Sequence, residues 1–244
     1  MNKSEEFWDG VSKNYDKTEE RFEYIHSRSR ENTRKLLKES DTVLDYGCGA
    51  GTAACQFSSQ VKEIHGMDIS SKMIEIAKEK TAVSQAQNLS FEQSDIFDEK
   101  YSNESYDVIL AFNMLHTVPS PQDVIQRINE LLKPEGLFIS VTPCLRQKMS
   151  LLVNLQIQLV RVLCKFGVIP IPIRRITSFE VDGLLEAGGF QATESEEIYK
   201  GASSYFVAAK KLQKTQKVHA VGPSKAGPLM RGVAATSLER YDSG

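Results

Sequence analysis

Between Asp41 and Pro143, the spacing of apolar residues alternates between a pattern typical of strands and one typical of helices. Short runs that are almost continuously apolar, such as TVLDY and SYDVILAFNML, are typical of strands buried on both faces of a parallel sheet. Between them, apolar residues recur every three or four positions, as on one face of a helix. The expected strands cover residues 42–46, 61–70, 88–95, 105–115 and 137–143, and the expected helices cover 50–60, 71–82 and 120–136.

This alternation predicts an α/β fold with right-handed crossovers and a doubly wound, mostly parallel, Rossmann-like sheet. After a helix over residues 178–190 that ends at two glycines, residues 191–199 and 203–211 are expected to pair as an antiparallel hairpin at the sheet edge. The predicted sheet therefore has seven strands.

A helical insertion of about residues 145–175 follows the fifth strand. It begins with a long amphipathic helix, expected from Leu145 to Phe166, and ends at the two prolines of GVIPIPI. This helix either buries itself against the sheet, or walls a pocket for an apolar molecule or docks on a lipid-bearing partner. The following Arg174 and Arg175 either meet an acidic substrate group or stay solvated. The polar face of the helix consists of Asn154, Gln158, Arg161 and Lys165.

Three segments differ in composition. Residues 1–40 are charged with scattered aromatics and predict a helical lid over the site. Residues 41–212 carry the strand and helix alternation and form the expected core domain. Residues 213–244 are rich in Gly, Pro, Ala, Ser and Lys without periodicity, which predicts a disordered tail.

The composition argues against several kinds of protein and binding partner. The 244 residues are 41% apolar and 25% charged, as in a globular protein, and the net charge of -2 predicts no broad attraction to nucleic acid. The four cysteines show no spacing typical of a metal site, and no apolar run is long enough to span a membrane. The cysteine spacing therefore predicts a protein without a metal site. Because the N-terminus MNKSEEFWDG is unlike a secretion signal, we expect a cytoplasmic location. The sequence leaves the oligomeric state open.

The glycine-rich stretch LDYGCGAGT follows the first expected strand. A phosphate-binding P-loop would need a lysine that this stretch lacks. A dinucleotide fingerprint that begins at Gly47 would need glycine in place of Thr52, whereas one that begins at Gly49 meets Ala54, which the looser motif tolerates. The stretch resembles more fully the first motif of the class I S-adenosylmethionine-dependent methyltransferases, in which an acid closes the strand and alternate glycines follow. The resemblance spans about residues 41–210.

This resemblance implies a site for S-adenosylmethionine, with S-adenosylhomocysteine as product. Gly47 and Gly49 would let the ligand approach the backbone, and Asp45 would bind its ammonium group. Asp68, at the end of the second strand, would accept hydrogen bonds from the ribose hydroxyls, although an acid there would also suit NAD. Ile69 and Met73 would lie against the adenine, unless they are ordinary core residues.

The later motifs carry further roles in the family. In SFEQSDIFD, Asp95 would accept a hydrogen bond from the adenine amino group, and the backbone N–H of Ile96 would donate to the ring. Phe112 and Asn113 end the fourth strand, at the sheet edge where ligands bind. Tyr15 of KNYDKT matches relatives whose first helix folds over the cofactor.

His116 follows the fourth strand and is the candidate catalytic residue. It would act either as a general base or as a structural histidine beside the cofactor. The implied reaction is in-line displacement of the methyl group toward a small-molecule acceptor that is apolar or aromatic. A methyltransferase acting on RNA or protein, and a non-catalytic module that binds S-adenosylmethionine, are the alternatives.

Overall fold

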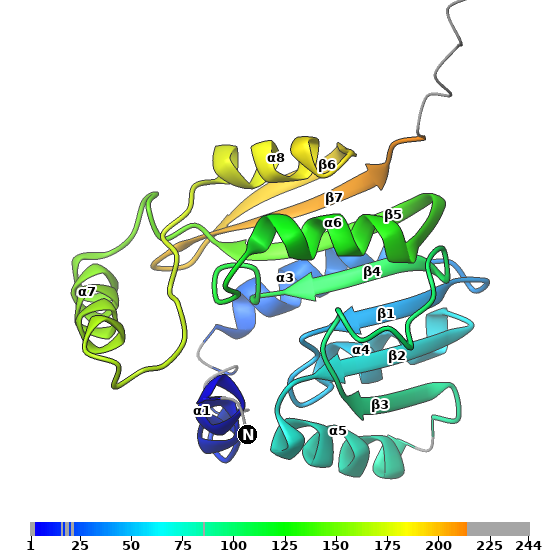
Figure 1. The fold of residues 1–244 in the computed structure, drawn as a ribbon, viewed down its shortest axis with the longest axis horizontal. Helices are drawn as coiled ribbons and strands as arrows, with labels where there is room; N and C mark the ends of the chain where they lie inside the picture. The colour runs from blue at the N-terminus through cyan, green and yellow to red at the C-terminus, as the bar shows by residue number, and fades with distance from the viewer. Residues whose placement is uncertain (1–2, 16, 18–19, 21, 85, 214–244) are drawn as a thin grey trace, which may run out of the picture. The chain divides into compact units, whose positions relative to one another are not determined.

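A computed structural model describes residues 3–15, 17, 20, 22–84 and 86–213. They contain one seven-stranded sheet with strand order β3-β2-β1-β4-β5-β7-β6 (Figure 1). The first five strands are parallel, and β7 runs antiparallel to both β5 and β6. This arrangement confirms the predicted α/β sheet and its C-terminal hairpin. The strands are β1 (Thr42–Tyr46), β2 (Glu63–Asp68), β3 (Leu89–Gln93), β4 (Tyr106–Phe112), β5 (Leu132–Pro143), β6 (Phe190–Tyr199) and β7 (Ser203–Lys211).

Helices α5 to α8 each begin at a capping side chain. Ser70 accepts a hydrogen bond from the Met73 N–H, and Thr177 and Glu180 form a reciprocal capping box. None of the helices in the described ranges is long and apolar enough to cross a membrane. The helices are α1 (Lys3–Ser12), α3 (Glu23–Arg34), α4 (Thr52–Phe57), the 3-10 turn η1 (Ser58–Gln60), α5 (Ser71–Ser84), α6 (Pro121–Leu131), α7 (Leu151–Lys165) and α8 (Ser178–Ala187).

Each face of the sheet has its own core. Helices α6 and α8 cover the face toward the viewer in Figure 1, where Leu44 and Ile109 pack with Ile125 and Leu185. Helices α3, α4 and α5 cover the other face, which includes Val43. Because side chains alternate along a strand, the neighbouring Val43 and Leu44 enter different cores, and β1 is buried throughout.

Strand β5 is longer than predicted. The sequence placed its start at residue 137, after a Pro/Gly stop, but the strand begins at Leu132, directly after α6. Leu132 is fully buried and pairs with Tyr106, and a bulge then brings Leu137 opposite Val108. Pairing of Leu132 and Leu137 on either side thus holds the KPEG segment in the strand, because an irregular ladder accommodates Pro and Gly.

Helix α7 departs from the prediction in two ways. It begins at Leu151 instead of Leu145, since Ser150 caps it and Met149, just before it, forms an isolated bridge with Ala202, which precedes β7. No residue of α7 is buried, so it does not bury itself against the sheet. It stands beyond the carboxyl ends of the parallel strands, at the left of Figure 1. The predicted tail, from residue 214 on, lies outside the described residues.

Candidate active site

A cavity of about 450 Å³ opens at the carboxyl ends of β1, β2 and β4, a size that suits a small-molecule ligand. Nine of the eleven residues predicted to bind the cofactor line it. The other two differ: Asp45 lines a smaller adjoining cavity, and the side chain of Ile96 is fully buried in the core beside α6. The nine are Tyr15, Gly47, Gly49, Asp68, Ile69, Met73, Asp95, Phe112 and Asn113.

The glycine loop is shaped by backbone contacts. The N–H groups of Gly47 and Cys48 both donate to the Met67 carbonyl, at 2.9 and 3.0 Å, which fixes the loop to β2. Gly49 has a φ of +52°, and a Cβ built there would lie 3.1 Å from the Tyr15 ring. A side chain at Gly49 would therefore be strained and crowded against Tyr15, so glycine lets the loop and the Tyr15 ring pack closely.

Asp68 joins the loop to the second strand. Its carboxylate accepts hydrogen bonds from the backbone N–H of Gly49 at 3.0 Å and of Ser70 at 2.9 Å. Burial raises the pKa of Asp68, and these two hydrogen bonds oppose that shift. The acid predicted to hold a ribose is thus fixed in place and faces the cavity.

Helix α1 closes one side of the cavity and supplies Ser4 and Trp8 to its lining. Asp9 holds the helix there, because its carboxylate accepts from the Ser70 hydroxyl at 2.5 Å and from the Lys72 N–H at 3.1 Å, at the start of α5. Partial burial raises the pKa of Asp9, but these hydrogen bonds outweigh it, and the net shift is downward. The carboxylate also lies favourably at a helix N-terminus.

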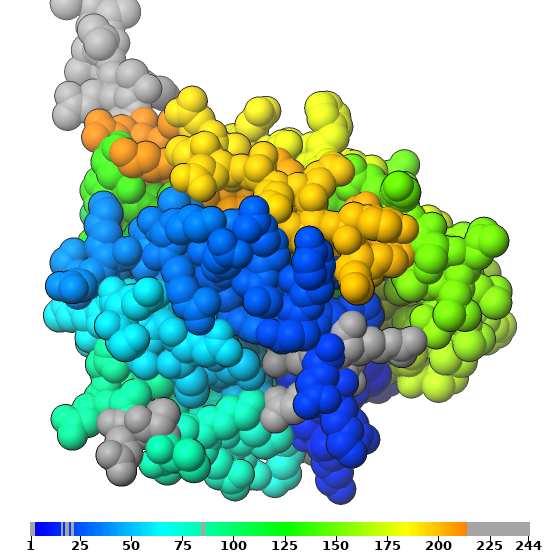
Figure 2. Space-filling model, turned by 180° about the vertical axis from the view of Figure 1, so that it is seen from behind, coloured from blue at the N-terminus to red at the C-terminus, as the bar shows by residue number. Residues whose placement is uncertain are grey.

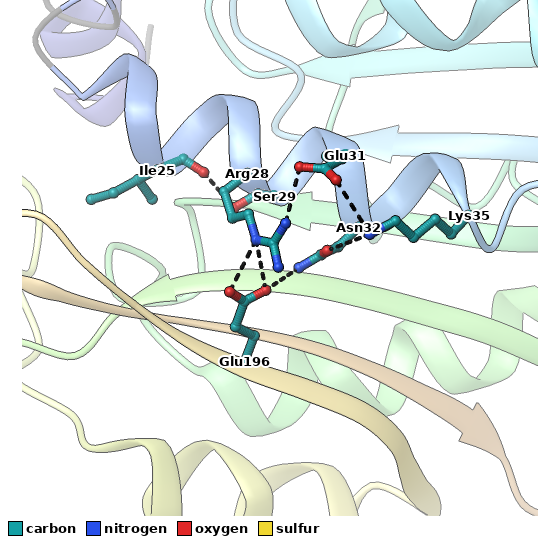
Figure 3. Close-up of polar contacts among 7 residues, drawn as sticks. All are labelled: Ile25, Arg28, Ser29, Glu31, Asn32, Lys35 and Glu196. Carbon is teal, nitrogen blue, oxygen red and sulfur yellow. Dashed lines mark hydrogen bonds and ion pairs between the residues drawn. The ribbon is translucent and has the colours of Figure 1, made fainter.

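Helix α3 lines the smaller cavity with polar side chains. Figure 3 shows Glu196 of β6 accepting from Arg28 Nε at 3.0 Å and from Asn32 Nδ2 at 2.5 Å, which fixes the helix to the sheet. One turn apart on α3, His26 and Arg30 line the smaller cavity of about 40 Å³ together with Asp45. Burial lowers the pKa of His26, and the Arg30 charge adds to the shift.

Arg30 is the residue that sequence reasoning missed in this cavity lining. It is only 7% exposed and pairs with Glu23 at 2.6 Å. Little in the sequence signalled it, because arginine is usually exposed and only the fold buries this one.

His116 lies apart from both cavity linings. Its backbone carbonyl accepts from the Arg174 N–H at 2.9 Å, and burial lowers the pKa of its imidazole to about 4. The ring is therefore neutral at pH 7 and has low proton affinity. Its role as a base stays a prediction.

The remaining cavity wall is mainly apolar. Besides Trp8, it includes Met114, Val118 and Ile171, the last from the predicted GVIPIPI segment, with Asp123 at the start of α6. Sequence reasoning did not select Asp123, because topology alone brings α6 to this place.

The two arginines after GVIPIPI fix that segment to its surroundings. Arg174 Nε donates to the Val118 carbonyl at 3.3 Å, and Arg175 Nε donates to the Leu145 carbonyl at 2.6 Å. Backbone carbonyl oxygens thus accept hydrogen bonds from both guanidinium groups. The sequence had left open whether these arginines meet an acidic substrate group or solvent.

Asn113 has a φ of +55°, and its N–H donates to the Val141 carbonyl at 2.7 Å. Asparagine tolerates this left-handed region better than most residues, and such conformations gather at functional sites. Asn113 borders both cavities, as does Phe112.

Comparison with known proteins agrees with this geometry. Residues 37–189 match the model of a family described as methyltransferase domain. The malonyl-[acyl-carrier protein] O-methyltransferase of Halalkalibacterium halodurans is 32% identical over 147 residues, which are 58% of this chain and 52% of that protein. The ubiquinone biosynthesis O-methyltransferase of Haemophilus ducreyi is 32% identical over 126 residues, 49% of this chain and 50% of that protein.

Among solved structures, YcgJ of Bacillus subtilis superposes with a TM-score of 0.64 at 17% identity, covering 78% of this chain and 100% of that one. This likeness concerns the fold. The chain spans about half the length of the curated relatives that it matches. The family model covers more than half of the chain, and it includes the glycine loop and the strand-end acids. The chain therefore belongs to the methyltransferase domain family, among the class I S-adenosylmethionine-dependent methyltransferases.

Proposed function

We propose that this chain transfers the methyl group of S-adenosylmethionine to an apolar or aromatic small molecule by in-line displacement. One observation carries the proposal: a single cavity is lined both by the acids and glycines of the cofactor motifs and by Trp8, Met114, Val118 and Ile171. Such a cavity can hold a charged nucleoside and an apolar acceptor side by side.

The residues fit this cofactor. Asp68 would accept from the ribose hydroxyls, and Gly47 and Gly49, which line the same cavity, would let the ligand approach the backbone. Asp45 would bind the ammonium group and Arg30 the carboxylate of the methionyl end, since both line the smaller cavity. The adenine roles of Ile69, Met73, Asp95 and Ile96, and the lid role of Tyr15, belong to the same proposal.

The chain contributes mainly alignment. When bound, S-adenosylmethionine supplies an electrophilic methyl group on sulfur, and S-adenosylhomocysteine remains after transfer. Phe112, Asn113 and the glycine loop would fix the position of that end, and Trp8 and Met114 would hold the acceptor in line with it. Positioning of this kind is worth about 7–11 kcal/mol of the barrier. The low pKa of His116 favours its structural role over the role of base.

The acceptor atom is also part of the proposal. Both named relatives are O-methyltransferases, so oxygen is the first atom to test. The apolar wall favours a small molecule over RNA or protein. A cytoplasmic location, a lid formed by residues 1–40 and a core of 41–212 complete the proposal.

The test combines binding with turnover. Calorimetric titration should give binding of S-adenosylmethionine and none of NADH, and a panel of hydroxylated aromatic and apolar compounds should release S-adenosylhomocysteine. Asp68→Asn should weaken cofactor binding about 10–100-fold, because hydrogen bonds to a charged group are worth about 1.5–3 kcal/mol. The exposed Asp98→Asn is the matched control. Binding of NADH in preference to S-adenosylmethionine would refute the proposal, and binding without turnover would favour a non-catalytic module.

A further inference from the structure

Helix α7 exposes a continuous row of large apolar side chains. Along the helix they lie on one side, and Leu151 is 89%, Leu155 69% and Phe166, just after the helix, 77% exposed. We call this set the α7 apolar face; it consists of Leu151, Leu152, Leu155, Leu159, Val162 and Phe166. Exposed patches of this kind mark interaction sites in proteins that fold alone.

Helix α7 packs only loosely on the rest of the protein. Its opposite side, with Val153 and Ile157, is only half-buried, and no residue of α7 is buried. In Figure 2 the α7 segment, yellow-green at the right, forms an edge of the surface. The apolar face therefore has room for an extended surface to approach it.

The charged residues of the segment that carries α7 are all of one sign. From Gly136 to Phe179 the sequence has no acidic residue, although the whole chain has a net charge of -2. The segment carries six basic residues: Arg146, Lys148, Arg161, Lys165, Arg174 and Arg175.

Among the residues that the structure describes, an acid pairs with only one of these six basic side chains. Arg146 pairs with Glu180 at 2.6 Å, but Arg161 donates to the uncharged amide of Gln158, and Lys148 lies over the Tyr199 ring. Arg161 and Lys165 are exposed and belong to the polar face of α7, which borders the α7 apolar face. Long basic side chains in that position can extend toward anionic groups while their stems cover apolar surface.

We propose that α7 docks its apolar face on an anionic lipid surface, with Arg161 and Lys165 against the headgroups. An apolar face flanked by basic residues, on a helix of 15 residues that is too short to span, is the pattern of a helix lying in the membrane interface. Anionic lipids complement a segment free of acids. A second copy of this chain would instead bring two basic surfaces together.

Docking would also orient the catalytic cavity. Ile171, six residues beyond the end of α7, lines that cavity, and Arg174 ties the same segment to the Val118 carbonyl. An apolar acceptor dissolved in lipid would then reach the cavity from the docked side. This consequence rests on the proposed function, whereas the docking itself does not.

Vesicle flotation of the full chain tests the proposal. We expect binding to vesicles of phosphatidylcholine with phosphatidylglycerol, and at least tenfold weaker binding to phosphatidylcholine alone or in high salt. The double variant Leu155→Glu/Leu159→Glu should lose binding at least tenfold, and Arg161→Gln/Lys165→Gln should lose it roughly tenfold. Val83→Glu, at an 86% exposed position of α5, is the matched control and should bind as the parent does.

Circular dichroism and thermal melting of each variant establish that it folds. The proposal is overturned if the parent ignores anionic vesicles, if the double glutamate variant still binds, or if neutral vesicles bind equally well. It is also overturned if sedimentation shows a dimer that the glutamates dissociate while vesicles stay unbound. Calorimetric binding of S-adenosylmethionine, measured on the same samples without lipid, separates failure of docking from failure of the proposed function.

Discussion

A side chain at Gly49 would meet the Tyr15 ring, which lies 3.1 Å from a Cβ built at that position. Because φ is also +52°, Gly49→Ala adds backbone strain to the clash. We expect the variant to lose about 1–3 kcal/mol of unfolding free energy and to bind S-adenosylmethionine at least tenfold more weakly, as measured by urea denaturation and calorimetry.

Gly183→Ala is the control for that variant. A Cβ at Gly183, within α8, has nothing within 4 Å, so alanine should stabilise the helix by up to about 1 kcal/mol and leave cofactor binding unchanged. Equal cofactor affinity in the Gly49 variant would show that the loop does not approach the ligand.

His116 gives a prediction that depends on pH. Burial lowers its pKa from 6.5 to about 4 in the folded protein, so the unfolded chain binds the proton more readily. The unfolding free energy should therefore fall as pH drops from about 6.5 to 4, by up to about 3 kcal/mol from this group. His116→Gln should flatten that part of the stability profile, measured by denaturant titration at each pH.

The same variant tests the alternative role of His116. A general base typically contributes 10²–10⁴-fold to the rate, so a loss of that size in kcat would restore the catalytic assignment. A kcat within a few-fold of the parent value would support the structural role that the buried ring favours.

At the scale of elements, the attachment of α3 to β6 sets the position of His26 and Arg30. Glu196→Gln removes the charge that holds Arg28 and Asn32. Because these side chains are partly exposed, we expect a loss of only about 1 kcal/mol in stability, but a several-fold loss in cofactor affinity. Denaturation and calorimetry measure the two effects. The exposed Glu194→Gln on the same strand should change neither.

The elements also show what the sequence could predict. The buried strands such as β1 and the hairpin of β6 and β7 were predicted, because their apolar pattern is local. The starts of β5 and α7 were not, since pairing of Leu132 with Tyr106 and of Met149 with Ala202 decides them. Likewise, the strand-end residue Asp68 follows from a local motif, whereas Arg30 and Asp123 reach the site through the tertiary fold.

At the scale of the whole molecule, a ligand that bridges the loop, the strand ends and α1 should stabilise the folded state. At a concentration 100 times its Kd, S-adenosylmethionine should add about 2.7 kcal/mol, because only the folded chain binds it. For a chain of this size that corresponds to a rise in Tm of about 5–11 °C. Differential scanning fluorimetry measures the shift, with NADH and the Asp68→Asn variant as controls that should shift much less.

Trp8 lies on α1, against the cavity, and it is the single tryptophan of the chain. Its indole emission therefore reports on one place only, the contact between the N-terminal helix and whatever fills the site. Excitation near the red edge of protein absorption gives a label-free optical record of ligand entry and release. Stopped-flow traces of that signal would time ligand binding separately from turnover.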